Sequence, residues 1–300
     1  MLIKQLEKKI RSLNLNLYGI CEYESGEWEK ITLRECNPKN DVYSVSKSVT
    51  SLVTGILIGE GVMSLEDHVT DVLGGLADFP PGWEEVTVEH LLTHTTGHAE
   101  GCLDIDSADI SAWGFLDYIE VVTKQPLVYT PGKKMCYSDS NFYLLSRMIT
   151  AKSGRMLQDL VRERILIPME IMGTAWAVCP KGYAMGATGL FLGVEDMAKL
   201  GVLMLHHGNW KGRQLVPAFW TEEMRKKRIV SRHSAQDYYG YGMWRRSDTD
   251  ASIISGSRGQ RIFVFPDREH VVAWQGYTGS AGLGLLINEL LQLEKGSLQG

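Results

Sequence analysis

The chain has 300 residues, 44% of them hydrophobic, and a formal net charge of −5. That length can bury a large core, and the mixing of both charge signs excludes the basic block typical of nucleic-acid binding, so we expect no nucleic-acid partner. No segment approaches the roughly 18 apolar residues that a membrane-spanning helix needs, so we expect no membrane partner either.

The cysteines and the first residues of the chain indicate the cellular compartment in which the protein is expected. The five cysteines are Cys21, Cys36, Cys102, Cys136 and Cys179. Their odd number and the lack of a CxxC motif argue against a disulfide framework and a zinc site, and favour a reducing environment. The first twenty residues carry charges where a signal peptide has an apolar run. We therefore expect a cytoplasmic protein.

Apolar periodicity predicts the helices and strands in chain order. An amphipathic helix is expected at 2–13, followed by strands at 15–23 and 27–34. The middle of the chain is helical in pattern, with helices expected at 44–60, 87–93, 109–123, 139–153 and 155–167. The last third is mixed, with helices expected at 194–207, 217–227 and 280–294 and strands at 239–246, 251–256, 261–266 and 270–275.

This order of elements favours an α+β fold. Two strands near the start and four near the end predict an antiparallel sheet that is built from both chain ends and flanked by helices, with an inserted helical subdomain. No repeat, low-complexity linker or Pro/Gly-rich boundary divides the chain. We expect one domain over 1–300, with an α/β part at about 1–50 and 173–300 and a helical part at about 51–172.

The segment 43–48, Tyr-Ser-Val-Ser-Lys-Ser, leads into the helix expected at 44–60. Ser44 and Lys47 form an S-x-x-K motif, and on a helix this spacing places both side chains on one face, one turn apart. An adjacent lysine lowers the cost of forming a serine alkoxide, by its charge when protonated or as a proton acceptor when neutral. The spacing alone also fits a solvated serine and lysine at a helix start. However, the helix is apolar on nearly every side, and a lysine at the mouth of a buried helix is costly without a partner or a function.

A second segment, Tyr137-Ser138-Asp139, opens the helix expected at 139–153. Ser and Asp are common N-cap residues, so these three residues by themselves indicate a capped helix with a packed tyrosine before it.

Taken together, several blocks carry a family resemblance. They are Ser44 to Lys47, LLTHTTG at 91–97, PGKKMCYSDSNFYLLSRM at 131–148 and GATGLFLGVEDMAKLG at 186–201. In this order and spacing, from about residue 17 to about 290, the chain resembles the β-lactamase-related serine hydrolases, which include class C β-lactamases, penicillin-binding D-Ala-D-Ala carboxypeptidases and family VIII esterases. The resemblance implies a β-lactamase/transpeptidase-like fold. It also implies that Ser44 is the acylated nucleophile, Lys47 its activating partner, and Tyr137 the general base and later the general acid.

The chain departs from that family at two motifs. Asp139 stands where class C β-lactamases have Asn, and an ionised Asp can only accept hydrogen bonds, which favours an ester or amide substrate over a β-lactam. The K-T-G motif is missing, and residues 253–266 occupy its place. The family's oxyanion hole implies two backbone N–H groups, that of Ser44 and one within 257–260, which we place at Ser257, with Gly259 in the same substrate-binding turn. Arg258 is either an anchor for a substrate carboxylate or a surface arginine.

The sequence predicts neither a metal nor a cofactor. His90, His94 and His98 are four residues apart, but Thr95-Thr96-Gly97 interrupts the helix and no HExxH motif is present. No P-loop and no GxGxxG motif between a strand and a helix occurs, so nucleotide binding has no support.

We therefore expect a serine hydrolase that cleaves a small-molecule ester, amide or peptide-like substrate through an acyl-Ser44 intermediate. One alternative is a penicillin-recognising β-lactamase or D-Ala-D-Ala carboxypeptidase. A second alternative is a catalytically silent relative that binds a ligand. The sequence predicts neither the substrate nor the oligomeric state.

Overall fold

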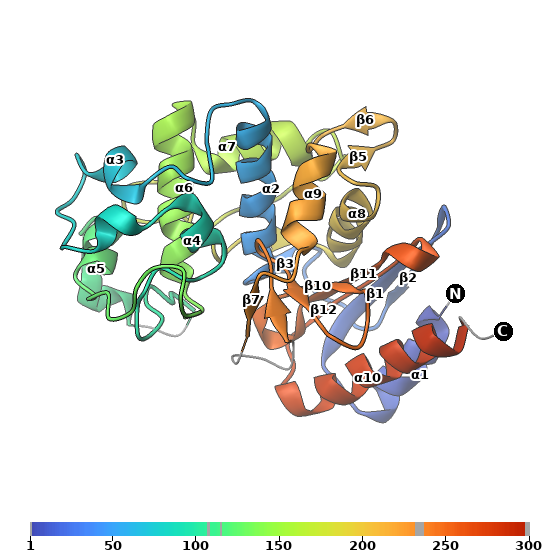
Figure 1. The fold of residues 1–300 in the computed structure, drawn as a ribbon. Coiled ribbons are helices and arrows are strands. Elements are labelled where there is room, and N and C mark those ends of the chain that lie inside the picture. Colours follow the sequence, from blue (N-terminus) through green and yellow to red (C-terminus); the bar gives the residue numbers. More distant parts are fainter. Residues whose placement is uncertain (1, 107–108, 115, 232–236, 298–300) are drawn as a thin grey trace.

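The structure, a computed structural model, describes residues 2–106, 109–114, 116–231 and 237–297. Its centre is an antiparallel sheet in which strands from both ends of the chain lie next to each other (Figure 1). Within the described residues the sheet has eight strands in the order β2-β1-β12-β11-β10-β9-β8-β7. The strands are β1 (Leu17–Glu24), β2 (Glu27–Thr32), β7 (Ile229–Val230), β8 (Tyr238–Tyr239), β9 (Trp244–Arg245), β10 (Ser252–Ser255), β11 (Arg261–Phe265) and β12 (His270–Gly276). The predicted sheet built from both chain ends is confirmed.

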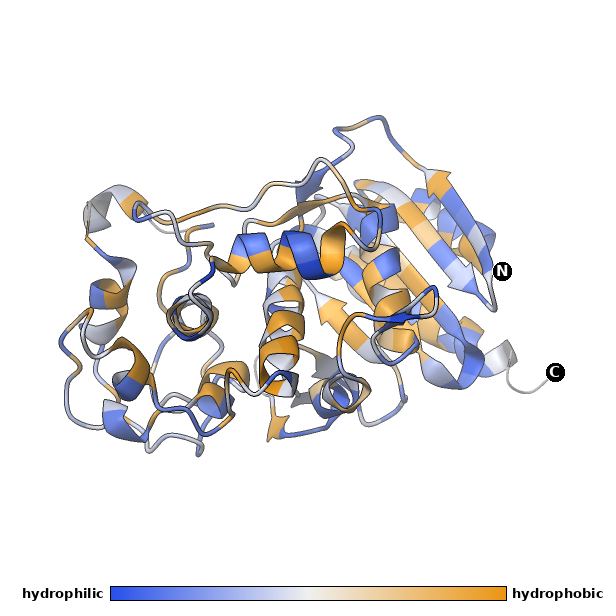
Figure 2. Ribbon diagram, turned by 90° about the horizontal axis from the view of Figure 1, so that it is seen from above, coloured by the Kyte–Doolittle hydropathy of each residue, from blue (hydrophilic) through white to orange (hydrophobic). Residues whose placement is uncertain are grey.

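Helices cover both faces of this sheet. Helices α1 (Ile3–Ser12) and α10 (Ser280–Ser297) lie side by side on one face, and α8 (Val194–Leu205) packs on the other (Figure 1). Side chains alternate between the faces along β12, so that Val272 and Trp274 belong to the core under α1 and α10, while Val271 and Ala273 belong to the core under α8. Figure 2 shows apolar residues concentrated along the strands and the helices packed on them.

The helical part of the molecule packs around α2 (Val45–Gly59), which is buried along nearly its whole length. Its neighbours are α6 (Asp139–Ser153), α7 (Leu157–Val161) and α9 (Ala218–Arg225), and the shorter helices are α3 (Val69–Leu73), α4 (Val88–Leu92) and α5 (Tyr118–Thr123). The α2–α9 contact is close because Gly55 has no side chain: a Cβ there would lie 2.0 Å from the indole ring of Trp220. Among the described residues, no helix is both long and apolar enough to cross a bilayer.

Two further pairs of short strands lie outside the eight-stranded sheet. One joins β3 (Asn40–Asp41) to β4 (Phe191–Leu192), and the other joins β5 (Asn209–Trp210) to β6 (Arg213–Gln214). The first pair lies directly before the start of α2. It therefore fixes the chain just ahead of Ser44.

Most predicted elements are confirmed within two or three residues, but three differ from the expectation. The strand expected at 239–246 is two short strands, because the chain turns at 240–243, where the Gly240 N–H donates to the Met243 carbonyl at 2.8 Å. The helix expected at 109–123 is a short 3-10 turn, Ile110–Trp113, followed by α5, with Gly114 at a φ of 55° between them; residue 115 lies outside the described residues. The helix expected at 155–167 begins at Leu157 and ends in a π-helical turn.

Candidate active site

Ser44 is the N-cap residue of α2, and Lys47 lies one turn further along the same helix. The Lys47 side chain is 0% exposed, and its Nζ donates to Ser44 Oγ at 2.9 Å. Tyr43 precedes them with a φ of 48°, a left-handed conformation that a side chain of this size rarely adopts. The chain therefore turns sharply just before the helix, and the serine hydroxyl and lysine ammonium meet at its end.

The surroundings of Lys47 keep it charged. Its Nζ also donates to Asp139 Oδ1 at 2.6 Å and to the Ala187 carbonyl at 3.1 Å, and it lies 4.8 Å from the centre of the Tyr137 ring. Burial alone would lower the pKa of Lys47, but the Asp139 carboxylate and Tyr137 outweigh it, and the net effect is to raise the pKa above its ordinary value. At neutral pH the group beside Ser44 is an ammonium.

Tyr137 lies just before α6, where Ser138 caps the helix by accepting from the Ser140 N–H. Aromatic rings surround it. The Trp244 ring stacks on it with centroids 5.4 Å apart, and the Tyr239 ring meets it edge-on at 5.9 Å. These two aromatic residues come from β8 and β9, so the sheet supplies one wall around the phenol.

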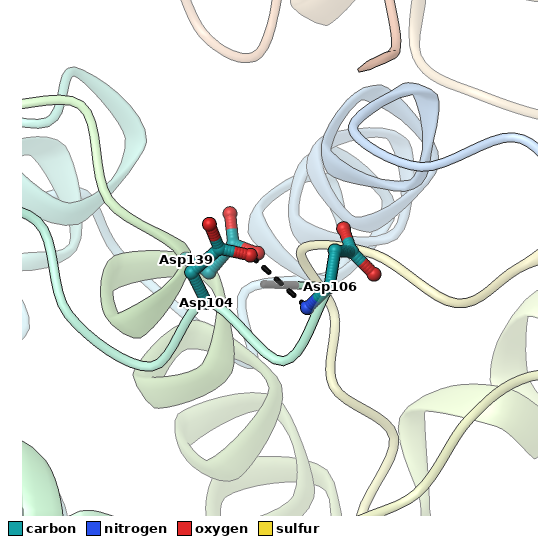
Figure 3. Close-up of side chains that lie close together, drawn as sticks. All are labelled: Asp104, Asp106 and Asp139. Atoms are coloured by element: carbon teal, nitrogen blue, oxygen red, sulfur yellow. Dashed lines mark hydrogen bonds between the residues drawn. The ribbon is translucent and has the colours of Figure 1, made fainter. Parts of the chain in front are cut away.

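Carboxylates gather on one side of Lys47. Asp104, Asp106 and Asp139 each place an oxygen within 4.8 Å of the others, and the Asp106 N–H donates to Asp104 Oδ1 at 3.1 Å (Figure 3). Burial and the neighbouring carboxylates raise the pKa of Asp106, and the same causes raise the pKa of Asp41 to about 6. Lys47 offsets part of this negative charge through its contact with Asp139.

The turn that replaces the K-T-G motif lies close to the start of α2. A Cβ on Gly256 would come 2.2 Å from the Val42 carbonyl, so only glycine lets β10 approach the segment before Ser44 this closely. The turn continues through Ser257–Gly259, in which Ser257 and Arg258 are exposed and Gly259 is buried.

A cavity of about 620 Å³ opens between this turn and the acidic residues. Its lining includes Tyr43, Asp106, Arg258 and Tyr277. Arg261 lines it as well, and donates from Nη1 to the Gly256 and Gln260 carbonyls, each at 2.7 Å. Burial lowers the pKa of Arg261 to about 10. The cavity therefore has carboxylates on one wall and guanidinium groups on another.

The structure brings Ser44, Tyr137 and Asp139 together around Lys47, and it places Ser257, Arg258 and Gly259 across the cavity from the acidic residues. Sequence reasoning missed a further set, which is Asp41, Asp104, Asp106, Ala187 and Arg261. Ala187 and Arg261 carried a signal, since they lie in the segments 186–201 and 253–266. The three aspartates lie in loops or in the two-residue strand β3, where no periodicity marks them.

An antiparallel sheet from both chain ends, with a buried lysine and a serine at the start of the central helix, defines the β-lactamase/transpeptidase fold. The chain belongs to the beta-lactamase family, whose family model matches residues 40–288. It is thus a member of a hydrolase family.

Individual relatives are more distant. A protein of Escherichia coli K12, provisionally named D-alanyl-D-alanine carboxypeptidase, is 28% identical over 134 residues, which are 42% of this chain and 31% of that protein. The chain thus spans about a third of that relative. A Bacillus anthracis structure, provisionally named 6-aminohexanoate-dimer hydrolase, has a TM-score of 0.81 at 17% identity and covers 98% of this chain and 82% of its own. A D-stereospecific amidohydrolase from Streptomyces has a TM-score of 0.75 at 18% identity, and the match covers 95% of this chain and 97% of that chain. At these identities the structures show a shared fold.

Proposed function

We propose that this protein is a serine hydrolase that cleaves an ester or amide bond of a small-molecule substrate through an acyl-Ser44 intermediate. The observation that carries the proposal is the position of the Lys47 ammonium, which is 2.9 Å from Ser44 Oγ and 4.8 Å from the centre of the Tyr137 ring. A nucleophile, a cation and a phenol that converge in this way are the groups that acyl transfer requires.

Each group has one role in this reaction. Because its pKa is raised, Lys47 acts by charge and stabilises the alkoxide instead of accepting its proton. Tyr137 takes the Ser44 proton as Oγ attacks the carbonyl carbon, and it returns that proton to the leaving group when the tetrahedral intermediate collapses. The backbone N–H groups of Ser44 and Ser257 hold the oxyanion. Water then attacks the acyl-enzyme, and Tyr137 accepts a proton from that water and passes it to Ser44 Oγ as the acid product leaves.

The environment of Asp139 favours ester or amide substrates over β-lactams. Its Oδ1 accepts from Lys47, and an ionised carboxylate has no proton to donate to a substrate carbonyl. The name of the Streptomyces neighbour, a D-stereospecific amidohydrolase, supports an amide among the substrates to be tested.

Turnover of short-chain p-nitrophenyl esters and p-nitroanilides tests the proposal. Ser44→Ala should abolish turnover, and electrospray mass spectrometry of the quenched wild type should find the acyl group on Ser44. Ser51→Ala is the matched control, because Ser51 lies on the same helix and its buried Oγ has no hydrogen-bond partner among the described residues. Full turnover by Ser44→Ala would refute the mechanism.

Membership of the beta-lactamase family supports a second candidate, a penicillin-recognising enzyme. Incubation with benzylpenicillin, followed by mass spectrometry of the intact protein, separates the two. A penicilloyl adduct on Ser44, or release of penicilloate, would favour this candidate, whereas an unmodified protein that leaves benzylpenicillin intact and still hydrolyses esters would exclude it.

A catalytically silent relative is the third reading. A fluorophosphonate probe distinguishes it, since an active serine is phosphonylated and an inactive one is not. Labelling of the wild type that Ser44→Ala removes would exclude a silent site.

A further inference from the structure

His94 has an unusual backbone conformation directly after α4. Its φ is 58°, in the left-handed region, and its side chain is 0% exposed. Helices commonly end in this conformation, but the residue that adopts it is usually glycine, because a side chain there adds strain. A buried, strained histidine at a position that favours glycine calls for an explanation in what the side chain contacts.

The contacts of His94 converge on Tyr137. The His94 carbonyl accepts from the Cys136 N–H at 2.8 Å, and His94 Nδ1 accepts from the Ser138 N–H at 3.3 Å. The imidazole also lies against the phenol ring, with centroids 4.3 Å apart and planes tilted by 38°. One residue therefore binds the backbone on both sides of Tyr137 and covers a face of its ring.

The hydrogen bonds also define which role the Nδ1 atom of the imidazole has. A backbone N–H can only donate, so His94 Nδ1 carries a lone pair and no proton. The Asn141 amide nitrogen faces the same atom at 3.1 Å, and its orientation is fixed because Asn141 Oδ1 accepts from Thr96 Oγ1 at 3.3 Å. His94 Nδ1 is thus a hydrogen-bond acceptor for the backbone next to Tyr137.

The Trp244 and Tyr239 rings also contact the Tyr137 side chain, but His94 contacts both the ring and the backbone on either side of it. Tyr137 precedes α6, outside the helical hydrogen-bond ladder, and its ring must stay beside Lys47 to act on Ser44. A displacement of about 1 Å in a catalytic group can cost on the order of 100-fold in rate.

We propose that His94 is the positioning residue for Tyr137, holding the phenol beside the Lys47 ammonium through the backbone of residues 136 and 138 and through ring contact. This inference rests on the proposed serine hydrolase function, in which Tyr137 transfers the proton.

The test measures the rate constant for fluorophosphonate labelling of Ser44 in the full chain, with circular dichroism and thermal unfolding as checks on folding. His94→Gly removes both side-chain contacts while relieving the backbone strain, and should slow labelling roughly 10- to 100-fold. His94→Asn tolerates the left-handed conformation and places an amide oxygen near the position of Nδ1, so it should recover part of the loss.

His90→Asn is the matched control. His90 lies on the helix that leads to His94, but its Nδ1 accepts from the Thr87 N–H at 3.1 Å, so labelling should stay within about twofold of the wild type. If His94 only supported the fold of this segment, the substitutions would lower thermal stability, but the labelling rates would not show the loss in His94→Gly and the partial recovery in His94→Asn.

A double-mutant cycle with Tyr137→Phe gives the decisive result. If His94 acts through the phenol, the His94 substitution should change labelling less than about twofold once the hydroxyl is gone. The same fold loss in both backgrounds would overturn the inference; should His94→Gly fail to fold, His94→Asn completes the cycle. If Ser44→Ala still labels and Tyr137→Phe has no effect, the proposed function itself fails, which is a different outcome.

Discussion

Lys47 and Asp139 form a buried ion pair in which Nζ and Oδ1 are 2.6 Å apart. They come from different helices and are joined across the α2–α6 contact. The carboxylate, at the position where the resemblance to class C β-lactamases leads one to expect an amide, sets the charge of the lysine beside the nucleophile.

Asp139→Asn should therefore change the pH dependence of acylation. Without the carboxylate, burial dominates and the pKa of Lys47 falls, so the ammonium loses its proton at lower pH. The alkaline limb of the labelling rate should move to lower pH than in the wild type. Asp104→Asn is the control, since it leaves the Lys47–Asp139 contact in place. An unchanged alkaline limb in Asp139→Asn would contradict the claim that the Asp139 carboxylate sets the charge of Lys47.

The same substitution should lower stability. Because the folded pKa of Lys47 lies above its unfolded value, the stability linked to the Lys47 proton is fully present below about pH 10 and is lost as pH rises further. Removing one member of a buried pair typically costs about 3–5 kcal/mol. Urea unfolding at pH 7 should show a loss of that order, and a loss below about 1 kcal/mol would show that water already screens the pair.

A second buried charge cluster, at the sheet face under α1 and α10, should make stability depend on alkaline pH. His270 Nδ1 lies 2.6 Å from Glu294 Oε1, and its Nε2 lies 2.8 Å from Glu22 Oε1. Burial lowers the pKa of His270, but these two carboxylates outweigh it and raise the pKa to about 9.

Stability from this cluster should be complete below about pH 6.5 and should fall as pH rises towards about 9, by about 3 kcal/mol in total. Burial raises the pKa of Glu22, but the His270 bond and the N–H groups of residues 2 and 3 lower it overall, so its contribution is lost as pH falls below about 4.5. Unfolding free energies measured from about pH 3 to 10 check both limits. His270→Gln should remove the alkaline slope, and His206→Gln, at a half-buried position away from the cluster, should retain it.

Gly55→Ala should destabilise the protein although alanine is the better helix former. The helix propensity gain is about 1 kcal/mol. The new Cβ would lie 2.0 Å from the Trp220 ring, and overpacking of this kind costs about 1–3 kcal/mol or more. Gly284→Ala is the control in α10, where a Cβ meets nothing within 4 Å, and it should stabilise by up to about 1 kcal/mol. Thermal unfolding of both variants should move in opposite directions.

Arg258→Ala should decide between the two roles open to this arginine. Its guanidinium lies 5.0 Å from the centre of the Tyr277 ring, in the lining of the cavity. If Arg258 anchors a substrate carboxylate, Arg258→Ala should raise KM about tenfold for esters that carry a carboxylate and leave KM for neutral esters unchanged. Arg246→Ala, which removes a pairing with Asp248 outside the cavity lining, is the control. If Arg258→Ala changes KM by the same factor for both ester types, or for neither, Arg258 is a surface residue.

The sequence predicts those parts of the site that depend on local geometry. The contact between Ser44 and Lys47 follows from helical spacing, and the start of α6 follows from its N-cap residues. The acidic cluster does not follow, because Asp104 reaches Asp139 only when a loop folds back against α6. The short strands β8 and β9 were missed for a similar reason, since a run of aromatic residues resembles one strand until Gly240 and Met243 close a turn.

The adjacency of β1 and β12 sets the order in which the chain can fold during synthesis. The hairpin of β1 and β2 can form as soon as it leaves the ribosome, since its two strands are neighbours in sequence. The other edge of β1 has no partner until translation has passed residue 276, when β12 arrives to pair with it. Contacts that distant in sequence form slowly. A nascent chain stalled before that point keeps an unpaired strand edge exposed, which makes it a substrate for chaperones.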